Sequence, residues 1–250
     1  LFDIHDFKMI LALPDFEKAN KYSDDKENWE KTATTIRQAM DEMGFPYEEE
    51  EGEAAFYGPK IDFIIKSALG TEYTISTCQL DFMAPARFDL DYRSDTGDQA
   101  PVLVIHRAPL GTHERFIAFL LEHYGGNFPT WLAPCQVKII PISDRHHDYA
   151  KKVYDALFQT EVSCASGGIR VELDNSSERM QKKIRNAQIE KVPYMLVIGD
   201  KEAESQTVNV RLRDGQTLSD IPVGQLTDRL KVEIEQRLDH QHAENKSEAQ

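Results

Sequence analysis

The chain has 250 residues, of which 40% are hydrophobic and 29% are charged, and its formal net charge is −14. This composition is typical of a globular protein with room for one large domain or two ordinary ones. No run approaches the ~20 apolar residues of a membrane span, and no charged-then-apolar signal peptide is present. Because the chain begins at Leu1 inside an apolar alternating pattern, we expect it to be a piece of a longer protein.

In the first half, strands are predicted at residues 7–13, 60–66, 72–82 and 102–105, and helices at 26–43 and 114–124. The helix at 26–43 has its apolar residues on one face, and the helix at 114–124 is expected to be buried. Residues 48–53 are predicted to be a solvated acidic loop. Antiparallel strands with helices, without a β-α-β alternation, indicate an α+β domain over residues 1–128.

Residues 129–134 form a proline-bounded linker, and the pattern changes after it. Strands are predicted at 137–142, 169–173, 194–198 and 207–212, and helices at 147–158, 178–191 and 223–238. This alternation predicts a compact α/β domain over residues 135–239. Residues 240–250 are polar and are predicted to be a disordered tail.

The cysteines and the charge distribution limit the possible partners. Cys78, Cys135 and Cys164 share no CxxC spacing, which argues against a disulfide framework and favours a reducing cytoplasm. A negative net charge argues against a nucleic-acid partner, but the acidic excess is concentrated in residues 1–132. The second half contains a local basic pattern of Arg179, Lys182, Lys183, Arg185 and Lys191.

Two segments of the first half have the residue types of a ligand site. Residues 104–116 connect a strand to a helix through a glycine turn and carry arginines, whose planar donors suit phosphate. An isolated corner of this kind is more often an ordinary surface turn. In residues 76–82, alternation places Thr77, Gln79 and Asp81 on one face. Since buried unpaired amides cost about 1–3 kcal/mol each, a bound ligand is one explanation of this face and a wet sheet edge is the other.

Together these segments resemble the class II aminoacyl-tRNA synthetases, and the threonyl-tRNA synthetase family in particular. Residues 104–116 resemble motif 3, residues 76–82 contain a Gln-Leu-Asp-Phe segment, and residues 55–63 resemble a further signature. The resemblance implies that Arg115, Lys60 and Gln79 are catalytic. It also implies that the ATP and threonine site comprises Tyr57, Lys60, Thr77, Gln79, Gly111 and Arg115. Thr74 and Ser76 depart from the commonest form of the family.

His106 stands where this family has the last of three zinc ligands, and the other two would lie upstream of this chain. By itself, a single histidine is more often a hydrogen-bonded core residue than a ligand. The resemblance therefore implies Zn²⁺ in the complete enzyme, together with Mg²⁺ bound with ATP. We do not expect the isolated chain to hold zinc tightly.

The second half resembles the anticodon-binding domain shared by the threonyl, prolyl, glycyl and histidyl enzymes, with close matches at residues 184–187, 191–197 and 199–202. The resemblance implies that the anticodon is read by Arg185, Lys191, Glu202 and Arg211. Lys191 stands where arginine is frequent and Ser177 where asparagine is frequent. A solvated amphipathic helix at 178–191 is the alternative interpretation.

The family implies ATP-dependent activation of L-threonine and its transfer to tRNA(Thr) by a cytoplasmic homodimer without membrane contact. Motifs 1 and 2 are missing from this chain, so the isolated chain is expected to be inactive. The alternative hypothesis is a truncated or diverged, non-catalytic relative that binds tRNA or has a regulatory role. The sequence upstream of Leu1 would distinguish the two.

Overall fold

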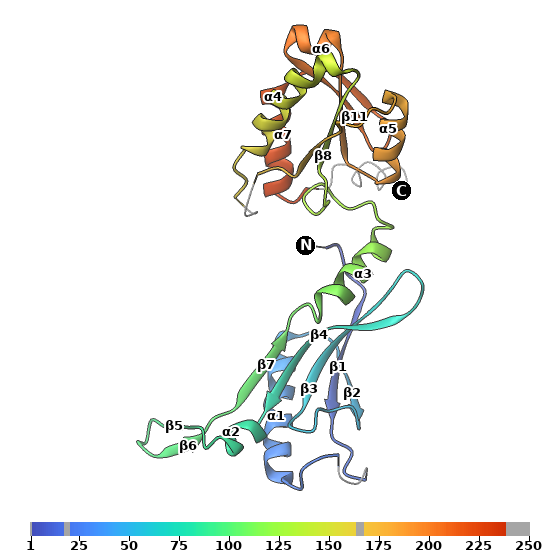
Figure 1. Ribbon diagram of the computed structural model, residues 1–250. Coiled ribbons are helices and arrows are strands. Elements are labelled where there is room, and N and C mark those ends of the chain that lie inside the picture. The colour runs from blue at the N-terminus through green and yellow to red at the C-terminus, as the bar shows by residue number, and fades with distance from the viewer. Residues whose placement is uncertain (1, 18–20, 164–167, 239–250) are drawn as a thin grey trace. The chain divides into compact units, whose positions relative to one another are not determined.

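A computed structural model describes residues 2–17, 21–163 and 168–238, and the chain divides into two compact units, Leu1–His123 and Tyr124–Gln250 (Figure 1). The predicted tail at 240–250 lies outside the described residues, as does Cys164. None of the helices in the described part combines the length and the apolar character needed to cross a lipid bilayer. The predicted combination of an α+β domain and an α/β domain is confirmed.

The first unit is built on a five-stranded sheet of order β2-β1-β3-β4-β7. Its strands are β1 (Phe7–Leu13), β2 (Glu48–Glu51), β3 (Lys60–Lys66), β4 (Glu72–Asp81) and β7 (Val104–Ala108). Its helices are α1 (Lys26–Met43), α2 (Met83–Arg87) and α3 (His113–His123). β5 (Asp91–Arg93) and β6 (Gln99–Pro101) form a separate two-stranded sheet, which the sequence did not reveal.

Helix α1 has the bounds that its apolar spacing predicts. The Asp25 side chain caps its first turn by accepting a hydrogen bond from the Asn28 amide, and Gly44 ends it in the left-handed conformation at φ 71°. Its inner face contributes Ala33, Ile36 and Met40 to a core that also contains β1, β3 and β4 residues. Figure 1 shows α1 behind the sheet, so one sheet face is covered by this helix.

The predicted acidic loop at 48–53 is wrong in part, because Glu48–Glu51 form β2. This strand pairs in parallel with β1, so β1, α1 and β2 make a β-α-β unit inside a mostly antiparallel sheet. All four glutamate side chains stay exposed, and Glu49 receives a 2.7 Å hydrogen bond from Arg37 of α1. The run of glutamates therefore predicted the exposure of the side chains correctly. It did not predict that the main chain of the same residues pairs at the sheet edge.

Two further predictions of the first half need correction. The strand predicted at 102–105 begins at Val104 and runs to Ala108, so His106 lies within β7 and not after it. Helix α3 buries only one face, through Phe116, Phe119 and Leu120, whereas Ile117 is 53% exposed. A helix with a single apolar stripe buries one face and leaves the other exposed, so the prediction of a buried helix at 114–124 is wrong in part.

The second unit has a five-stranded mixed sheet of order β12-β11-β10-β8-β9. Its strands are β8 (Val137–Pro141), β9 (Val171–Leu173), β10 (Tyr194–Ile198), β11 (Thr207–Leu212) and β12 (Thr217–Pro222). Its helices are α4 (His147–Phe158), α5 (Met180–Ile189), α6 (Asp200–Ser205) and α7 (Val223–Glu235), with a 3₁₀ turn at Asp144–His146. The sequence did not reveal β12, α6 or the 3₁₀ turn.

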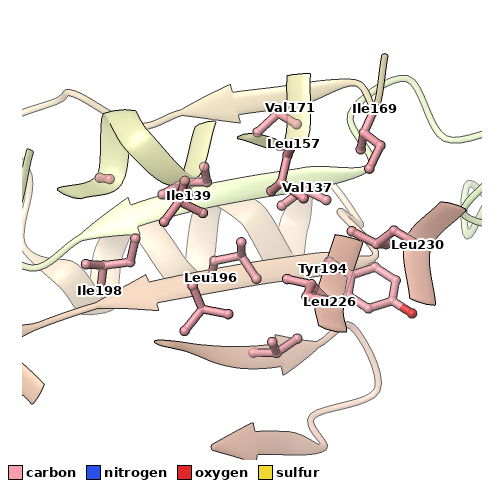
Figure 2. Packing of buried hydrophobic residues seen from close by; sticks show 14 of the residues in the cluster. Val137, Ile139, Leu157, Ile169, Val171, Tyr194, Leu196, Ile198, Leu226 and Leu230 are labelled. Carbon is pink, nitrogen blue, oxygen red and sulfur yellow. The ribbon is translucent and has the colours of Figure 1, made fainter. Parts of the chain in front are cut away.

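The main core of the second unit lies between the sheet and helices α4 and α7. Figure 2 shows Ile139, Leu196 and Tyr194 on neighbouring strands, with Leu157 of α4 and Leu226 of α7 packed against them. Helix α5 covers the opposite face, where its Ala187 packs with Ile140 and Met195. The two faces are therefore each covered by helix, as expected for strands that read as continuous apolar runs.

Candidate active site

The candidate active site lies on the face of the first sheet that α1 does not cover. Strand pairing aligns Lys60 of β3, Gln79 of β4 and His106 of β7 in one row across three strands. Directly paired residues of neighbouring strands point to the same side of a sheet. The same face carries Asp62, Thr77 and Asp81, and we call these six residues the polar face.

Tyr57 joins the polar face from the segment before β3. Its hydroxyl donates a hydrogen bond to Gln79 Oε1, and its ring lies 5.4 Å from the His106 ring between centroids. Burial, followed by the negative charge of Asp81, raises the pKa of Tyr57, so the phenol remains a donor at neutral pH. Gly58 makes this approach possible, because a Cβ at that position would meet the Leu80 carbonyl oxygen at 1.8 Å.

Lys60 and Asp62 form an ion pair on this face, with the ammonium 2.6 Å from Asp62 Oδ2. The Asp62 side chain is 9% exposed and the Lys60 side chain 21%. Asp62 Oδ1 is buried without a hydrogen-bond partner among the described residues. An unsatisfied buried carboxylate oxygen is costly, so this part of the face has the capacity to accept a hydrogen bond from a ligand.

Asp81 and His106 form a second hydrogen-bonded pair on the polar face. Asp81 Oδ1 accepts hydrogen bonds from the amides of Met83 and Ala84 at the start of α2, and its Oδ2 lies 2.9 Å from His106 Nε2. Asp81 is buried, whereas the His106 side chain is 47% exposed. Within the described residues there is no group of three or more His, Cys, Asp or Glu side chains that could hold a metal. Among the described side chains, the contact that His106 makes through its ring nitrogen is therefore the one with Asp81.

Gly111 and Arg115 lie at the corner between β7 and α3, within the segment that resembles motif 3. Gly111 has φ +60°, and a Cβ there would lie 3.2 Å from the Ile75 carbonyl oxygen, so the turn requires glycine. Arg115 follows on the first turn of α3 and is exposed. Arg107 is also exposed, but it pairs with Cys78 on β4 and therefore belongs to the opposite face of the sheet.

The predicted anticodon residues lie on three different elements of the second unit. Arg185 is exposed on α5, and Arg211 on β11 pairs with Met195, which places it on the α5 side of the sheet. Arg211 Nε is buried without a hydrogen-bond partner among the described residues. Lys191 follows α5 at φ 57°, and its ammonium donates to the Gly125 carbonyl oxygen at 2.5 Å. That contact engages Lys191 within its own unit.

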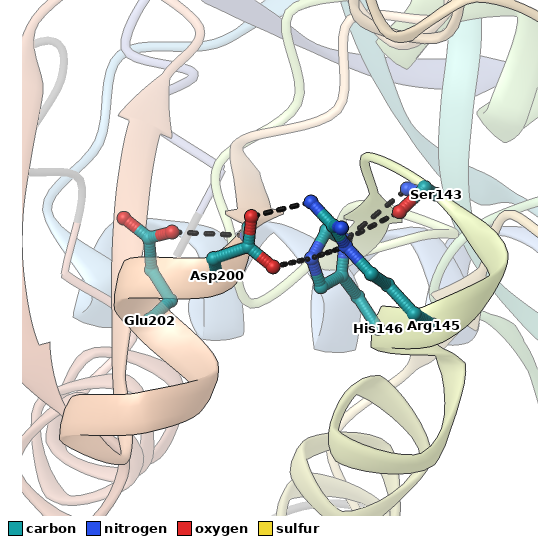
Figure 3. A network of polar contacts seen from close by, with 6 residues as sticks. Ser143, Arg145, His146, Asp200 and Glu202 are labelled. Atoms are coloured by element: carbon teal, nitrogen blue, oxygen red, sulfur yellow. Dashed lines mark hydrogen bonds and ion pairs between the residues drawn. The ribbon is translucent and has the colours of Figure 1, made fainter.

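Glu202 lies on α6 and is positioned by a polar network that joins two strand ends (Figure 3). Its Oε2 accepts a hydrogen bond from the Gly199 amide at 2.9 Å. Asp200, in the same turn, contacts the buried His146 at 2.9 Å and Arg145 at 2.5 Å. Hydrogen bonding to His146, followed by the charge of Arg145, lowers the pKa of Asp200. This network fixes the first turn of α6 against the end of β8.

The sequence did not identify Gly58 or Asp62 as parts of the site. Alternation within 60–66 placed Asp62 opposite its apolar neighbours, which was a signal that the strand has a second, polar side. The pairing of Asp81 with His106 had no sequence signal, because it depends on the register between β4 and β7.

Comparison with known proteins matches this arrangement to two family models. Residues 4–124 match the tRNA synthetase class II core domain (G, H, P, S and T), and residues 136–233 match the anticodon binding domain. The fold is thus that of a class II aminoacyl-tRNA synthetase core domain followed by an anticodon-binding domain.

Individual relatives place the chain within this class. It is 51% identical over 211 residues to threonine–tRNA ligase of Staphylococcus epidermidis, covering 84% of this chain and 32% of that protein. It is 48% identical over 234 residues to the Geobacillus sp. enzyme, covering 93% and 35%. The solved RNA binding domain of threonyl-tRNA synthetase from Cryptosporidium parvum superposes with a TM-score of 0.76 at 35% identity, covering 90% of this chain and 54% of that one.

The chain belongs to the threonyl-tRNA synthetase family. It spans about one third of the length of these curated relatives.

Proposed function

We propose that this chain forms part of a threonine–tRNA ligase, in which the polar face binds L-threonine and ATP and the second unit binds tRNA(Thr). The observation that carries the proposal is the row of Lys60, Gln79 and His106 across three strands, joined by Tyr57. Polar residues of three strands and of the turn before β3 meet on one face, although a sheet packs without such polar groups. ATP binds with Mg²⁺ in this proposal, as in the family.

Adenylation attacks the α-phosphate of ATP with the carboxylate of threonine and expels pyrophosphate. Such a step depends on positioning and on neutralisation of phosphate charge. In our proposal Lys60 and Arg115 supply the positive charge, and Gly111 allows the main chain to approach the nucleotide. Gln79, oriented by the Tyr57 hydroxyl, and Thr77 provide hydrogen bonds to the substrates.

We propose His106 as one ligand of the family's zinc ion, with the other ligands outside this chain. When bound, zinc would supply a Lewis acid for the amino and hydroxyl groups of threonine, and valine could not use it fully because it lacks the oxygen. The half-exposed imidazole and the buried carboxylate behind it support this assignment.

For the second unit we propose that Arg185, Glu202 and Arg211 contact the anticodon loop. Single-stranded loop bases are read by hydrogen bonds to their edges, and arginine and carboxylate side chains suit that task. The unsatisfied Arg211 Nε supports the assignment, as does the network that holds α6. Lys191 contributes less in this proposal, because its ammonium is bound to Gly125. We also propose a cytoplasmic homodimer for the complete enzyme.

A non-catalytic relative that only binds tRNA is the alternative, and threonine-dependent ATP–pyrophosphate exchange distinguishes the two. We expect the complete enzyme to exchange label with L-threonine and to charge tRNA(Thr). The isolated 250-residue chain should bind the tRNA without exchange. Absence of exchange from the complete enzyme, with tRNA binding intact, would contradict the ligase assignment and support the alternative.

A further inference from the structure

Asp81 is the most constrained side chain of the polar face. It is 3% exposed, and its Oδ1 accepts two main-chain hydrogen bonds, from Met83 at 2.8 Å and Ala84 at 2.9 Å. These bonds tie it to the first turn of α2. The carboxylate therefore cannot rotate without leaving two amides unsatisfied, and its Oδ2 is held toward His106 Nε2 at 2.9 Å.

A fixed carboxylate determines which nitrogen of a neutral histidine carries the proton. An ionised carboxylate only accepts hydrogen bonds, so the nitrogen facing it must be the N–H donor. His106 Nε2 faces Asp81, and the lone pair of the neutral ring is then on Nδ1. Outer carboxylates of this kind orient metal-binding histidines and set their tautomer.

We infer that Asp81 is a positioning residue that holds His106 in the Nε2–H tautomer, so that Nδ1 is the atom that binds the metal. This inference rests on the proposed function for the metal itself, whereas the tautomer is a property of this chain alone. Asp62, the other buried aspartate of the polar face, pairs with Lys60 and makes the natural comparison.

The tautomer is measured directly in the 250-residue chain by long-range ¹H–¹⁵N NMR with ¹⁵N-labelled histidine. The His106 signals are assigned by their loss in His106→Gln. At about pH 8, where unperturbed imidazoles are neutral, we expect Nε2 to be protonated and Nδ1 to be unprotonated. A protonated Nδ1, or an even mixture of the two tautomers, in the wild-type chain would overturn the inference. This measurement needs no substitution at Asp81, so a folding defect in a variant cannot affect it.

Asp81→Asn separates positioning from a structural role. The asparagine oxygen can still accept the two α2 amides, but its NH₂ then faces His106 Nε2 and requires an acceptor there. We expect the Nδ1–H tautomer in this variant, a thermal midpoint close to wild type, and zinc affinity of the complete enzyme reduced at least about tenfold. Chelator competition with zinc alone measures the affinity.

Asp62→Asn is the matched control, and it should leave both the His106 tautomer and the zinc affinity unchanged. An Asp81→Asn protein with the wild-type tautomer and wild-type zinc affinity would overturn the inference, as would an equal loss of zinc in both variants. If the wild-type complete enzyme activates threonine but holds no zinc, metal binding through Nδ1 is refuted while the proposed function stands. If it holds zinc but does not activate threonine, the ligase assignment fails and the role of Asp81 stands.

Discussion

The ammonium of Lys183 donates a hydrogen bond to the main-chain oxygen of Asp174 at 2.9 Å and lies 3.7 Å from its carboxylate. The Lys183 side chain is 4% exposed, whereas its neighbour Lys182 is 58% exposed and pairs with Glu178 on the helix surface. The two adjacent lysines of α5 therefore differ, because Lys183 is an internal cation and Lys182 is an external one. Of these two lysines, only Lys182 can meet an RNA phosphate.

Lys183→Met should destabilise the protein by about 1–3 kcal/mol, because the Asp174 carbonyl loses its donor and the carboxylate its counter-charge. Burial alone would raise the pKa of Asp174, but hydrogen bonds from Ser176 and the charges of Lys183 and Lys138 lower it below its ordinary value. The stability that the pair contributes is thus fully present above the ordinary carboxyl pKa. It is lost as pH falls through the lowered pKa of Asp174. Urea unfolding between about pH 7 and pH 3 measures both effects.

Lys182→Met is the control and should change stability by less than about 0.5 kcal/mol. Equal losses of stability in Lys183→Met and Lys182→Met at neutral pH would contradict the distinction between an internal and an external lysine.

Arg211→Gln should weaken binding of tRNA(Thr) at least about fivefold more than binding of the same tRNA with an altered anticodon. The reason is that a base-edge hydrogen bond contributes about 1 kcal/mol only where the matching base is present. Lys182→Ala should weaken both tRNAs about equally and reduce the salt dependence, as expected of a phosphate contact. Fluorescence anisotropy titrations with both tRNAs provide the comparison. Equal losses for both tRNAs with Arg211→Gln would reduce that residue to a phosphate contact.

A fragment of residues 124–238 should fold alone and be more stable than one of residues 135–238 by at least about 2 kcal/mol. The segment predicted as a linker is bound to the second unit: Arg170 donates to the carbonyl oxygens of Ala133 at 2.9 Å and Trp131 at 2.8 Å. Gln136 donates to Thr130, and Arg213 to Phe128. Removing residues 124–134 leaves these donors without those acceptors. Equal urea midpoints and slopes for the two fragments would show that the segment is only a connector.

Cys135 should react with a disulfide reagent only after the second unit unfolds. Burial, followed by the charge of Glu172, raises the pKa of its thiol to about 12, and the thiolate is the reactive form. Since the folded state holds the neutral thiol, stability should fall as pH rises above the ordinary thiol pKa toward about 12. Reaction kinetics at about pH 8 in native buffer should be unchanged by Cys135→Ser. Disappearance of a rapidly reacting thiol in that variant would refute the burial argument.

Periodicity predicted the regular elements well. The helices at 26–43 and 147–158 and the strands at 194–198 and 207–212 have the predicted bounds, because each has an apolar stripe or alternation and a clear end signal. β2 and β12 escaped prediction because their side chains are mostly exposed, so their pairing is a property of the main chain. Charged edge strands give no hydrophobic signal.

The site was predictable one strand at a time. Alternation placed Thr77, Gln79 and Asp81 together, and the family resemblance added Lys60 and His106. The row that joins Lys60, Gln79 and His106 depends on the register of three strands, and a shift of one residue would send each side chain to the other face. Sequence patterns do not specify register between distant segments, so the contacts of Asp62 and Asp81 came only from the structure.

The most direct test of the polar face as an adenylation site is threonine-dependent ATP–pyrophosphate exchange by the complete enzyme with Arg115→Ala, compared with Arg107→Ala. Both arginines are exposed at the same corner, but Arg107 pairs with Cys78 and belongs to the α1 side of the sheet. We expect Arg115→Ala to lower the exchange rate at least about tenfold, through loss of phosphate contacts worth roughly 1.5–3 kcal/mol. Arg107→Ala should stay within about twofold of wild type, a difference of less than about 0.5 kcal/mol. Wild-type exchange kinetics in Arg115→Ala, or an equal loss in both variants, would contradict the account.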